Sequence, residues 1–155
     1  MTLKQLIWRL IFPITIVLFG TITKWWYVLP VDAPGTIMVG FPFAFISDGW
    51  QTSMSFQIFV TEFLLDFAVY FSICFVLVYL VDLYLVKMKV PKLLTGLLWT
   101  FSTLIIAIAI WIASFPEQII QLNRHWDMKV MATGYKLTWT HLDRPGFSKY
   151  DPNKK

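Results

Sequence analysis

The apolar run from Phe56 to Val86 constrains this chain more than any other feature of its sequence. The run carries only three charged residues, Glu62, Asp66 and Asp82. A helix of about 20 apolar residues crosses the hydrocarbon core of a bilayer, so this run is long enough to span it. Carboxylates inside such a segment are costly and are functional candidates by default. The run therefore predicts a membrane protein, and its three acids need an explanation.

The composition agrees with a membrane protein. Hydrophobic residues make up 57% of the chain and charged residues 14%, whereas an ordinary soluble domain is about 45–50% apolar and about 25% charged. The 155 residues leave room for one domain. The net charge of +4 is small, and the basic residues flank apolar segments instead of forming one nucleic-acid-binding face. We expect residues 1–155 to form a single membrane domain that binds no nucleic acid.

Three apolar segments predict an all-α membrane protein with three transmembrane helices, at about residues 6–29, 58–86 and 93–115. Residues 116–155 are expected to form a juxtamembrane helix and an extramembrane tail. The first segment starts with basic residues, as a signal peptide does. Residues 20–24, however, offer no small-x-small cleavage site. We therefore expect an uncleaved anchor, with Trp25, Trp26 and Tyr27 as its interfacial aromatic belt.

Basic residues at the segment ends predict the orientation. Lys87, Lys89 and Lys92 lie between the second and third segments, and Lys4 and Arg9 lie near the start of the first. The positive-inside rule places both groups in the cytoplasm. This majority is narrow, because the residues after Pro116 would add cations outside. We expect a cytoplasmic N-terminus and an external C-terminus, and the small size and compact loops favour a bacterial inner membrane.

The third segment carries small residues on one helical face. At 100° per residue they form a stripe, and small residues let helices approach closely in lipid. We interpret the stripe as a helix-packing face. Its members are Gly96, Thr100, Thr103, Ala107 and Ser114.

The external loop over residues 30–55 is rich in proline, glycine and aromatic residues. Proline and glycine favour turns there. The aromatic side chains are too numerous for a solvated linker, so they are expected either at the membrane or a partner protein or folded back over the protein's own helices. The residues concerned are Phe41, Phe43, Phe45 and Trp50.

The segment after the third span is expected to form an amphipathic interfacial helix over Glu117–Met131. Ile119, Leu122, Trp126 and Val130 recur at near-helical spacing with polar residues between them. Residues 131–140 mix β-formers around Gly134 and are expected to form a short hairpin. The residues from His141 onward are expected to be extended.

No residue pattern predicts catalysis, a metal or a cofactor. His125 and His141 are the only histidines and Cys74 the only cysteine, whereas a zinc site needs three or four ligands. The sequence has no GxSxG, HExxH, Walker or dinucleotide-binding motif. We therefore expect a protein that is not an enzyme. A small membrane-embedded enzyme that uses Glu62, Asp66 and His125 stays an alternative.

The acids of the second segment have possible partners on the first. Asp82 lies 16 residues after Asp66, about 24 Å along a helix, which puts the acids near the two edges of the bilayer. Arg9 and Lys24 would be about 22 Å apart on an antiparallel helix. We therefore predict charge pairs of Arg9 with Asp82, and of Lys24 with Asp66 or Glu62. Asp66 and Asp82 differ by about 160° around an ideal helix, so both pairs need a tilt or kink.

The sequence thus predicts a non-catalytic integral membrane subunit or assembly partner of a larger membrane complex. Its partners would be the lipid bilayer and either another membrane protein or further copies of the chain. The main alternative is a component of proton- or cation-coupled transport that uses Glu62 and Asp66.

Overall fold

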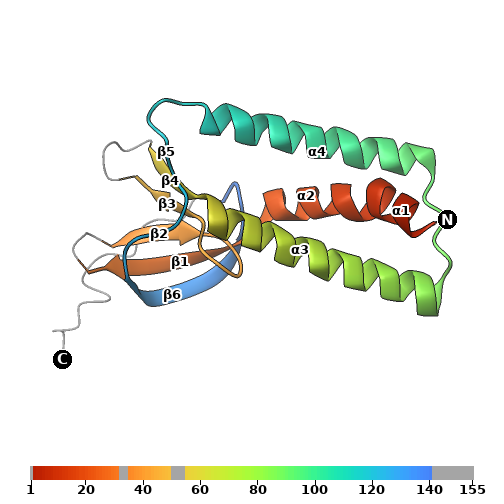
Figure 1. Cartoon of the computed structure of the whole chain (residues 1–155), viewed down its shortest axis with the longest axis horizontal. Coiled ribbons are helices and arrows are strands. Elements are labelled where there is room, and N and C mark those ends of the chain that lie inside the picture. Colours follow the sequence, from red (N-terminus) through yellow and green to blue (C-terminus); the bar gives the residue numbers. More distant parts are fainter. Residues whose placement is uncertain (1, 32–34, 50–54, 141–155) are drawn as a thin grey trace. The chain divides into compact units, whose positions relative to one another are not determined.

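A computed structural model describes residues 2–31, 35–49 and 55–140 of the chain (Figure 1). The chain divides into two compact units. We call residues Met1–Ile22 and Leu64–Pro116 the helical unit, and residues Thr23–Phe63 and Glu117–Lys155 the sheet unit.

The expected all-α class is wrong, because the sheet unit is built on a six-stranded mixed sheet with the strand order β5-β4-β3-β2-β1-β6. Strands β1 to β4 form antiparallel neighbours in chain order, and β5 pairs with β4 in parallel. The strands are β1 (Ile22–Pro30), β2 (Thr36–Val39), β3 (Ile46–Asp48), β4 (Phe56–Phe59), β5 (Ile119–Gln121) and β6 (Met128–Leu137).

Two of the expected helices are shorter than predicted because their apolar runs continue into strands. The first comprises α1 (Leu3–Leu6), the π-helical turn η1 (Ile7–Ile11) and α2 (Phe12–Thr21), and β1 follows without a break. The residues of β1 are mostly β-branched or aromatic, which favours an extended backbone. The second run begins as β4, and only then continues as α3 (Val60–Leu80) and the π-helical turn η2 (Val81–Leu85). The third helix is α4 (Lys92–Ala113).

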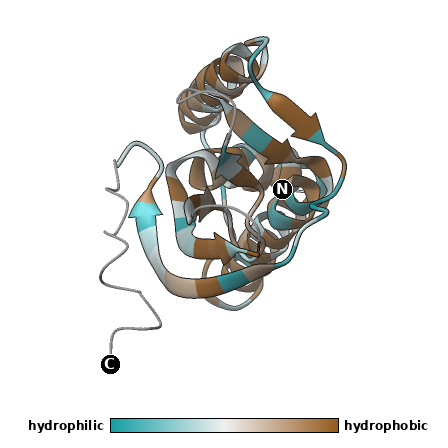
Figure 2. Ribbon diagram, turned by 90° about the vertical axis from the view of Figure 1, so that its left-hand side faces the viewer, coloured by the Kyte–Doolittle hydropathy of each residue, from teal (hydrophilic) through white to brown (hydrophobic). Residues whose placement is uncertain are grey.

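Three helices run side by side in the helical unit (Figure 1). Leu6, Leu10 and Ile11 of the first helix form a core with Cys74 of α3. Phe71, Phe75 and Val78 of α3 and Leu98 of α4 pack against this core. The first helix therefore contacts both of the others, and Figure 2, in which the helices are seen nearly end-on, shows them coloured mostly as hydrophobic.

The sheet unit has a separate core of Val28, Met38, Ala44 and Phe59, against which Trp26, Trp126 and Met128 pack. Trp26 is the register partner of Met38 in the pairing of β1 with β2. On β6, a Cβ on Gly134 would come within 2.6 Å of the indole Nε1 of Trp25. A larger residue at position 134 would therefore displace either the indole of Trp25 or this part of β6.

The amphipathic helix expected over Glu117–Met131 is also wrong. Ile119–Gln121 pairs with Gln57–Phe59 as a parallel strand, and the side chain of Gln118 accepts a 2.7 Å hydrogen bond from the backbone N–H of Phe56. These long-range pairings satisfy backbone groups that a helix would have bonded locally. The expected hairpin is absent from residues 131–140 as well, because β6 runs straight through Gly134. The tail from His141 lies outside the described residues.

Candidate functional site

The three acids lie along α3 and η2 in different surroundings. Glu62 is in the first turn of α3 and belongs to the sheet unit, whereas Asp66 and Asp82 belong to the helical unit. Asp66 is fully buried, and Glu62 and Asp82 are partly buried.

Glu62 lies at a polar corner where the start of α3 meets the segment between β5 and β6. The backbone N–H of Arg124 donates a 3.4 Å hydrogen bond to Oε1 of Glu62. Its other carboxylate oxygen is buried without a hydrogen bond to a described residue. A carboxylate in the first turn of a helix is stabilised by the helix dipole.

Thr61 reinforces the same corner. Its hydroxyl donates a 2.5 Å hydrogen bond to Oδ1 of Asn123, and its backbone N–H donates a 3.0 Å bond to the carbonyl of Leu122. The guanidinium of Arg124 lies 5.6 Å from the ring centre of Trp126. These contacts fix the chain that follows β5 against the start of α3, which gives Thr61 and Glu62 a structural role.

Asp82 holds the turn between η2 and α4. Its Oδ1 accepts a 2.7 Å hydrogen bond from the backbone N–H of Met88, and the N–H of Val86 bonds the carbonyl of Val81 at 3.0 Å. Asp82 therefore ties the segment after η2 back to the helix, a role that the sequence did not predict. Arg9 is partly buried in η1, and its pairing with Asp82 stays a prediction.

Lys24 lies on β1 and not on a helix. Its Nζ is 3.7 Å from the ring centre of Trp26, a cation–π contact. The helical rise assumed between Arg9 and Lys24 was therefore wrong, because α2 ends at Thr21. The predicted pairing of Lys24 with Asp66 or Glu62 stays a prediction that no longer has the helical spacing as support.

The stripe of small residues on α4 faces away from the contacts inside the helical unit. Thr100, Thr103, Ala107 and Ser114 are exposed, and a Cβ on Gly96 would meet nothing within 4 Å. The side of α4 that packs on the first helix carries Leu98, Trp99, Ser102 and Ile105.

Trp99 makes a hydrogen bond to the first helix, next to Pro13, that the sequence analysis missed. In the π-helical register the N–H of Phe12 bonds the carbonyl of Ile7. The next carbonyl, that of Trp8, would fall to residue 13, which is a proline without an N–H. The indole Nε1 of Trp99 takes its place and donates a 3.2 Å hydrogen bond to the carbonyl of Trp8. A proline inside an apolar helix was the available signal.

Ser102 adds a second polar contact between the same helices. It is fully buried, and its Oγ lies 3.0 Å from the carbonyl oxygen of Pro13 and 2.8 Å from that of Leu98. Ile105 lies three residues after Ser102 on α4. A Cβ on Gly20 of α2 would come within 2.6 Å of Cγ2 of Ile105. Small and polar groups thus hold α2 and α4 close together.

The aromatic residues of the expected external loop have different surroundings. Phe45 is buried and lies edge-to-face with Phe63 at 5.3 Å between ring centres. Phe41 lies 5.8 Å from the ring of Tyr135, and Phe43 is 47% exposed. Trp50 lies outside the described residues.

Among residues 2–31, 35–49 and 55–140, no three His, Cys, Asp or Glu side chains lie together as a metal site would require. A comparison with models of protein families, with curated proteins and with solved structures finds no match.

Proposed function

We propose that this chain is a non-catalytic integral membrane subunit that assembles with a second membrane protein through α4. Its three long helices would span the bilayer, and the sheet unit would lie outside the hydrocarbon. The observation that carries this proposal is the exposed apolar surface of the helices. Leu3–Thr21, Val60–Leu85 and Lys92–Ala113 are each long and apolar enough to cross a membrane.

The packing of the helical unit leaves that surface open. Each segment contains an apolar window of 18 residues. The buried share of this window is 33% in Leu3–Thr21, but only 11% in Val60–Leu85 and 6% in Lys92–Ala113. Soluble monomers rarely expose contiguous apolar patches larger than a few hundred Å². Lipid or another protein has to cover α3 and α4, which supports a membrane location.

The position of the small-residue stripe supports a protein partner. On an ideal helix, the stripe residues lie about 140° around α4 from the side that packs on the first helix. Gly96, Thr100 and Ala107 are therefore available to a helix outside this chain, and small residues permit close approach.

The charge distribution of the helical unit supports a cytoplasmic N-terminus. All five of its basic residues lie in α1, in η1 or between η2 and the first residue of α4. Arg124, Lys129 and Lys136, which weakened the prediction from sequence, belong to the sheet unit. The asymmetry is therefore stronger for the helices alone than for the whole chain.

The membrane location and orientation can be tested with single cysteines. In a Cys74→Ala background, Thr140→Cys should react with a membrane-impermeant maleimide in intact cells. Lys89→Cys should react only after permeabilisation, and the protein should stay in the membrane pellet after an alkaline carbonate wash. Release by carbonate would overturn the membrane location, and the reverse labelling pattern would overturn the orientation.

The partner surface can be tested by photocrosslinking in the native membrane. A photoreactive residue at position 100 or 107 should give a product of constant mass that contains a second protein. The matched positions 97 and 104 carry exposed leucines on the same helix and should crosslink mainly to lipid. Equal protein crosslinking at all four positions, or at none, would contradict a partner at the stripe.

A further inference from the structure

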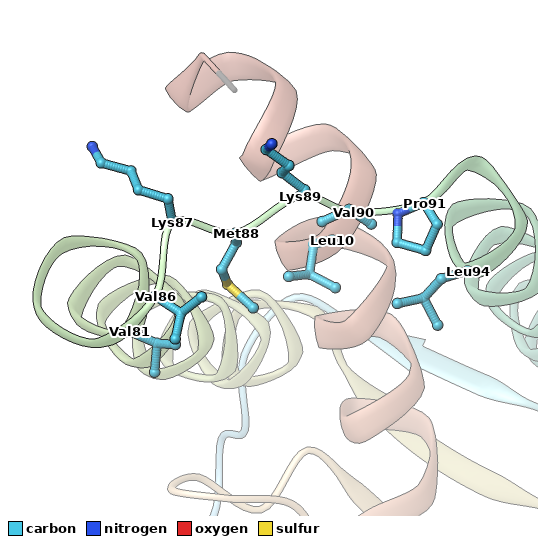
Figure 3. Close-up of a pocket in the computed structure, with 9 residues that line it drawn as sticks. All are labelled: Leu10, Val81, Val86, Lys87, Met88, Lys89, Val90, Pro91 and Leu94. Atoms are coloured by element: carbon cyan, nitrogen blue, oxygen red, sulfur yellow. The ribbon is translucent and has the colours of Figure 1, made fainter.

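A cavity of about 280 Å³ lies at the end of the helical unit where η2 is joined to α4 (Figure 3). Seven of its nine lining residues are apolar, and the other two are lysines. Leu10 of η1, Val81 of η2 and Leu94 of α4 form its walls, so all three helices contribute. The lining contains no acidic side chain. Apart from the two lysines, it has no polar side chain that could bind a polar solute.

The two lysines give the mouth of the cavity a positive charge. Figure 3 shows the side chains of Lys87 and Lys89 leaving the turn on the side away from Val81 and Leu94. Both are exposed, and neither ammonium group bonds another residue in the described part of the chain. The nearby carboxylate of Asp82 is occupied by the N–H of Met88. Lys92 follows at the start of α4 and adds a third cation.

The geometry points to a binding site for one anionic phospholipid, with an acyl chain in the cavity and the headgroup phosphate at Lys87 and Lys89. This inference rests on the proposed membrane location. The occupant has to match both parts of the site. A free phosphate would leave the apolar cavity unfilled, and a neutral lipid would leave the lysines without a counter-charge. Basic pockets between membrane helices on the cytoplasmic side bind anionic headgroups in this way.

Native mass spectrometry of the full chain in detergent tests the headgroup contact. The probes are phosphatidylglycerol and phosphatidylcholine with identical acyl chains. We expect phosphatidylglycerol to bind about 25-fold more tightly, since each of the two lysines near an anionic lipid contributes a factor of about five. The double variant Lys87→Gln/Lys89→Gln should lose this preference, whereas the matched variant Lys129→Gln/Lys136→Gln in the sheet unit should keep it. A preference that survives in the first variant, or is absent in the native chain, overturns the site.

A second arm tests the cavity. Leu94→Trp places a larger side chain against the lining and leaves both lysines in place. We expect it to weaken phosphatidylglycerol binding at least threefold, while circular dichroism shows an unchanged helix content. A smaller change Leu94→Phe should give an intermediate loss and serves if the tryptophan variant does not fold. Unaltered binding in the folded variant overturns the acyl-chain contact.

Two further measurements distinguish a lipid site from a simple anion site, and a failure of the lipid site from a failure of the proposed membrane location. Glycerol phosphate in large excess should not displace the lipid, and displacement would show a simple anion site and overturn the proposal. A chain that resists carbonate extraction but shows no preference for phosphatidylglycerol overturns the lipid site alone. A chain that carbonate releases overturns the membrane location, and the lipid site with it.

Discussion

The indole of Trp99 on α4 donates a hydrogen bond to the backbone carbonyl of Trp8 on the first helix, at 3.2 Å. The two rings also lie 5.2 Å apart between centres. The bond replaces the N–H that Pro13 lacks, so a proline that weakens one helix also creates an acceptor for another. In the proposed membrane environment, where no water can replace the donor, an unsatisfied carbonyl is costly, and this contact therefore helps to fix the position of α4 against η1.

The change Trp99→Phe should lower the stability of the helical unit by about 1–3 kcal/mol, because it removes the donor and keeps an aromatic ring. Thermal unfolding in detergent would measure this loss. Trp111→Phe is the matched control, since Trp111 is 65% exposed on the same helix.

A double-mutant cycle would test whether Pro13 is the reason for the Trp99 contact. Pro13→Ala restores a backbone N–H at position 13 that can bond within the helix. In that background Trp99→Phe should cost less than in the native chain, by about 1 kcal/mol. Purely additive losses would show that the two residues act independently.

Gly20 and Gly96 should respond differently to the same substitution. Gly20→Val places a side chain against Ile105, which a Cβ alone would approach to 2.6 Å. We expect a loss of about 1–3 kcal/mol from overpacking, partly restored by Ile105→Ala. Gly96→Val meets open space in the chain alone. It should leave the melting temperature of the purified protein nearly unchanged and reduce crosslinking from the stripe on α4.

Two variants of Asp82 distinguish its role as a hydrogen-bond acceptor from the role of its charge. Asp82→Asn keeps an oxygen that can accept from the N–H of Met88, whereas Asp82→Ala removes it. The alanine variant should therefore melt at a lower temperature than the asparagine variant. Hydrogen exchange of the Met88 amide would locate the effect. Equal losses in the two variants would show that the charge is what matters, as the predicted pair with Arg9 requires.

The stability of the sheet unit should depend on pH through Lys136. Partial burial lowers the pKa of Lys136 below its usual value of 10.5, and the charge of Asp48 partly opposes this shift. The folded chain therefore binds fewer protons than the unfolded chain between the lowered pKa and 10.5. Stability should rise with pH across that interval. The urea midpoint of the native chain should rise relative to that of Lys136→Met as the pH approaches 10.5. A difference between the two midpoints that does not change with pH would contradict the lowered pKa.

Long apolar runs located the three helices but not their ends. Between Thr21 and Ile22, and again between Phe59 and Val60, the apolar run continues while the backbone changes from one regular structure to the other. No proline marks either boundary, and the glycine near them, Gly20, is the penultimate residue of α2. The β-branched and aromatic residues of β1 carried a strand signal, but a bilayer interface attracts the same aromatic residues.

The two outer strands, β5 and β6, join the sheet through pairings that no local window contains. Ile120 pairs with Ile58, although α3 and α4 lie between them in the sequence. The local spacing of Ile119, Leu122 and Trp126 indicated a helix, because this distant pairing is not visible in it. The candidate sites could be predicted only in part, for a similar reason. Asp82 and Glu62 could be named as unusual acids from sequence. Their acceptor roles required the positions of Met88 and Arg124.

The parallel pairing of β4 with β5 imposes a parity rule on membrane insertion. β4 precedes α3 and β5 follows α4, yet their residues are hydrogen-bonded neighbours in one sheet. Both strands must therefore lie on the same side of any bilayer that the chain enters. An even number of crossings has to separate them, so α3 and α4 insert together as a hairpin or not at all. A chain with only one of them inserted would carry β4 and β5 on opposite faces, and its sheet could not be completed.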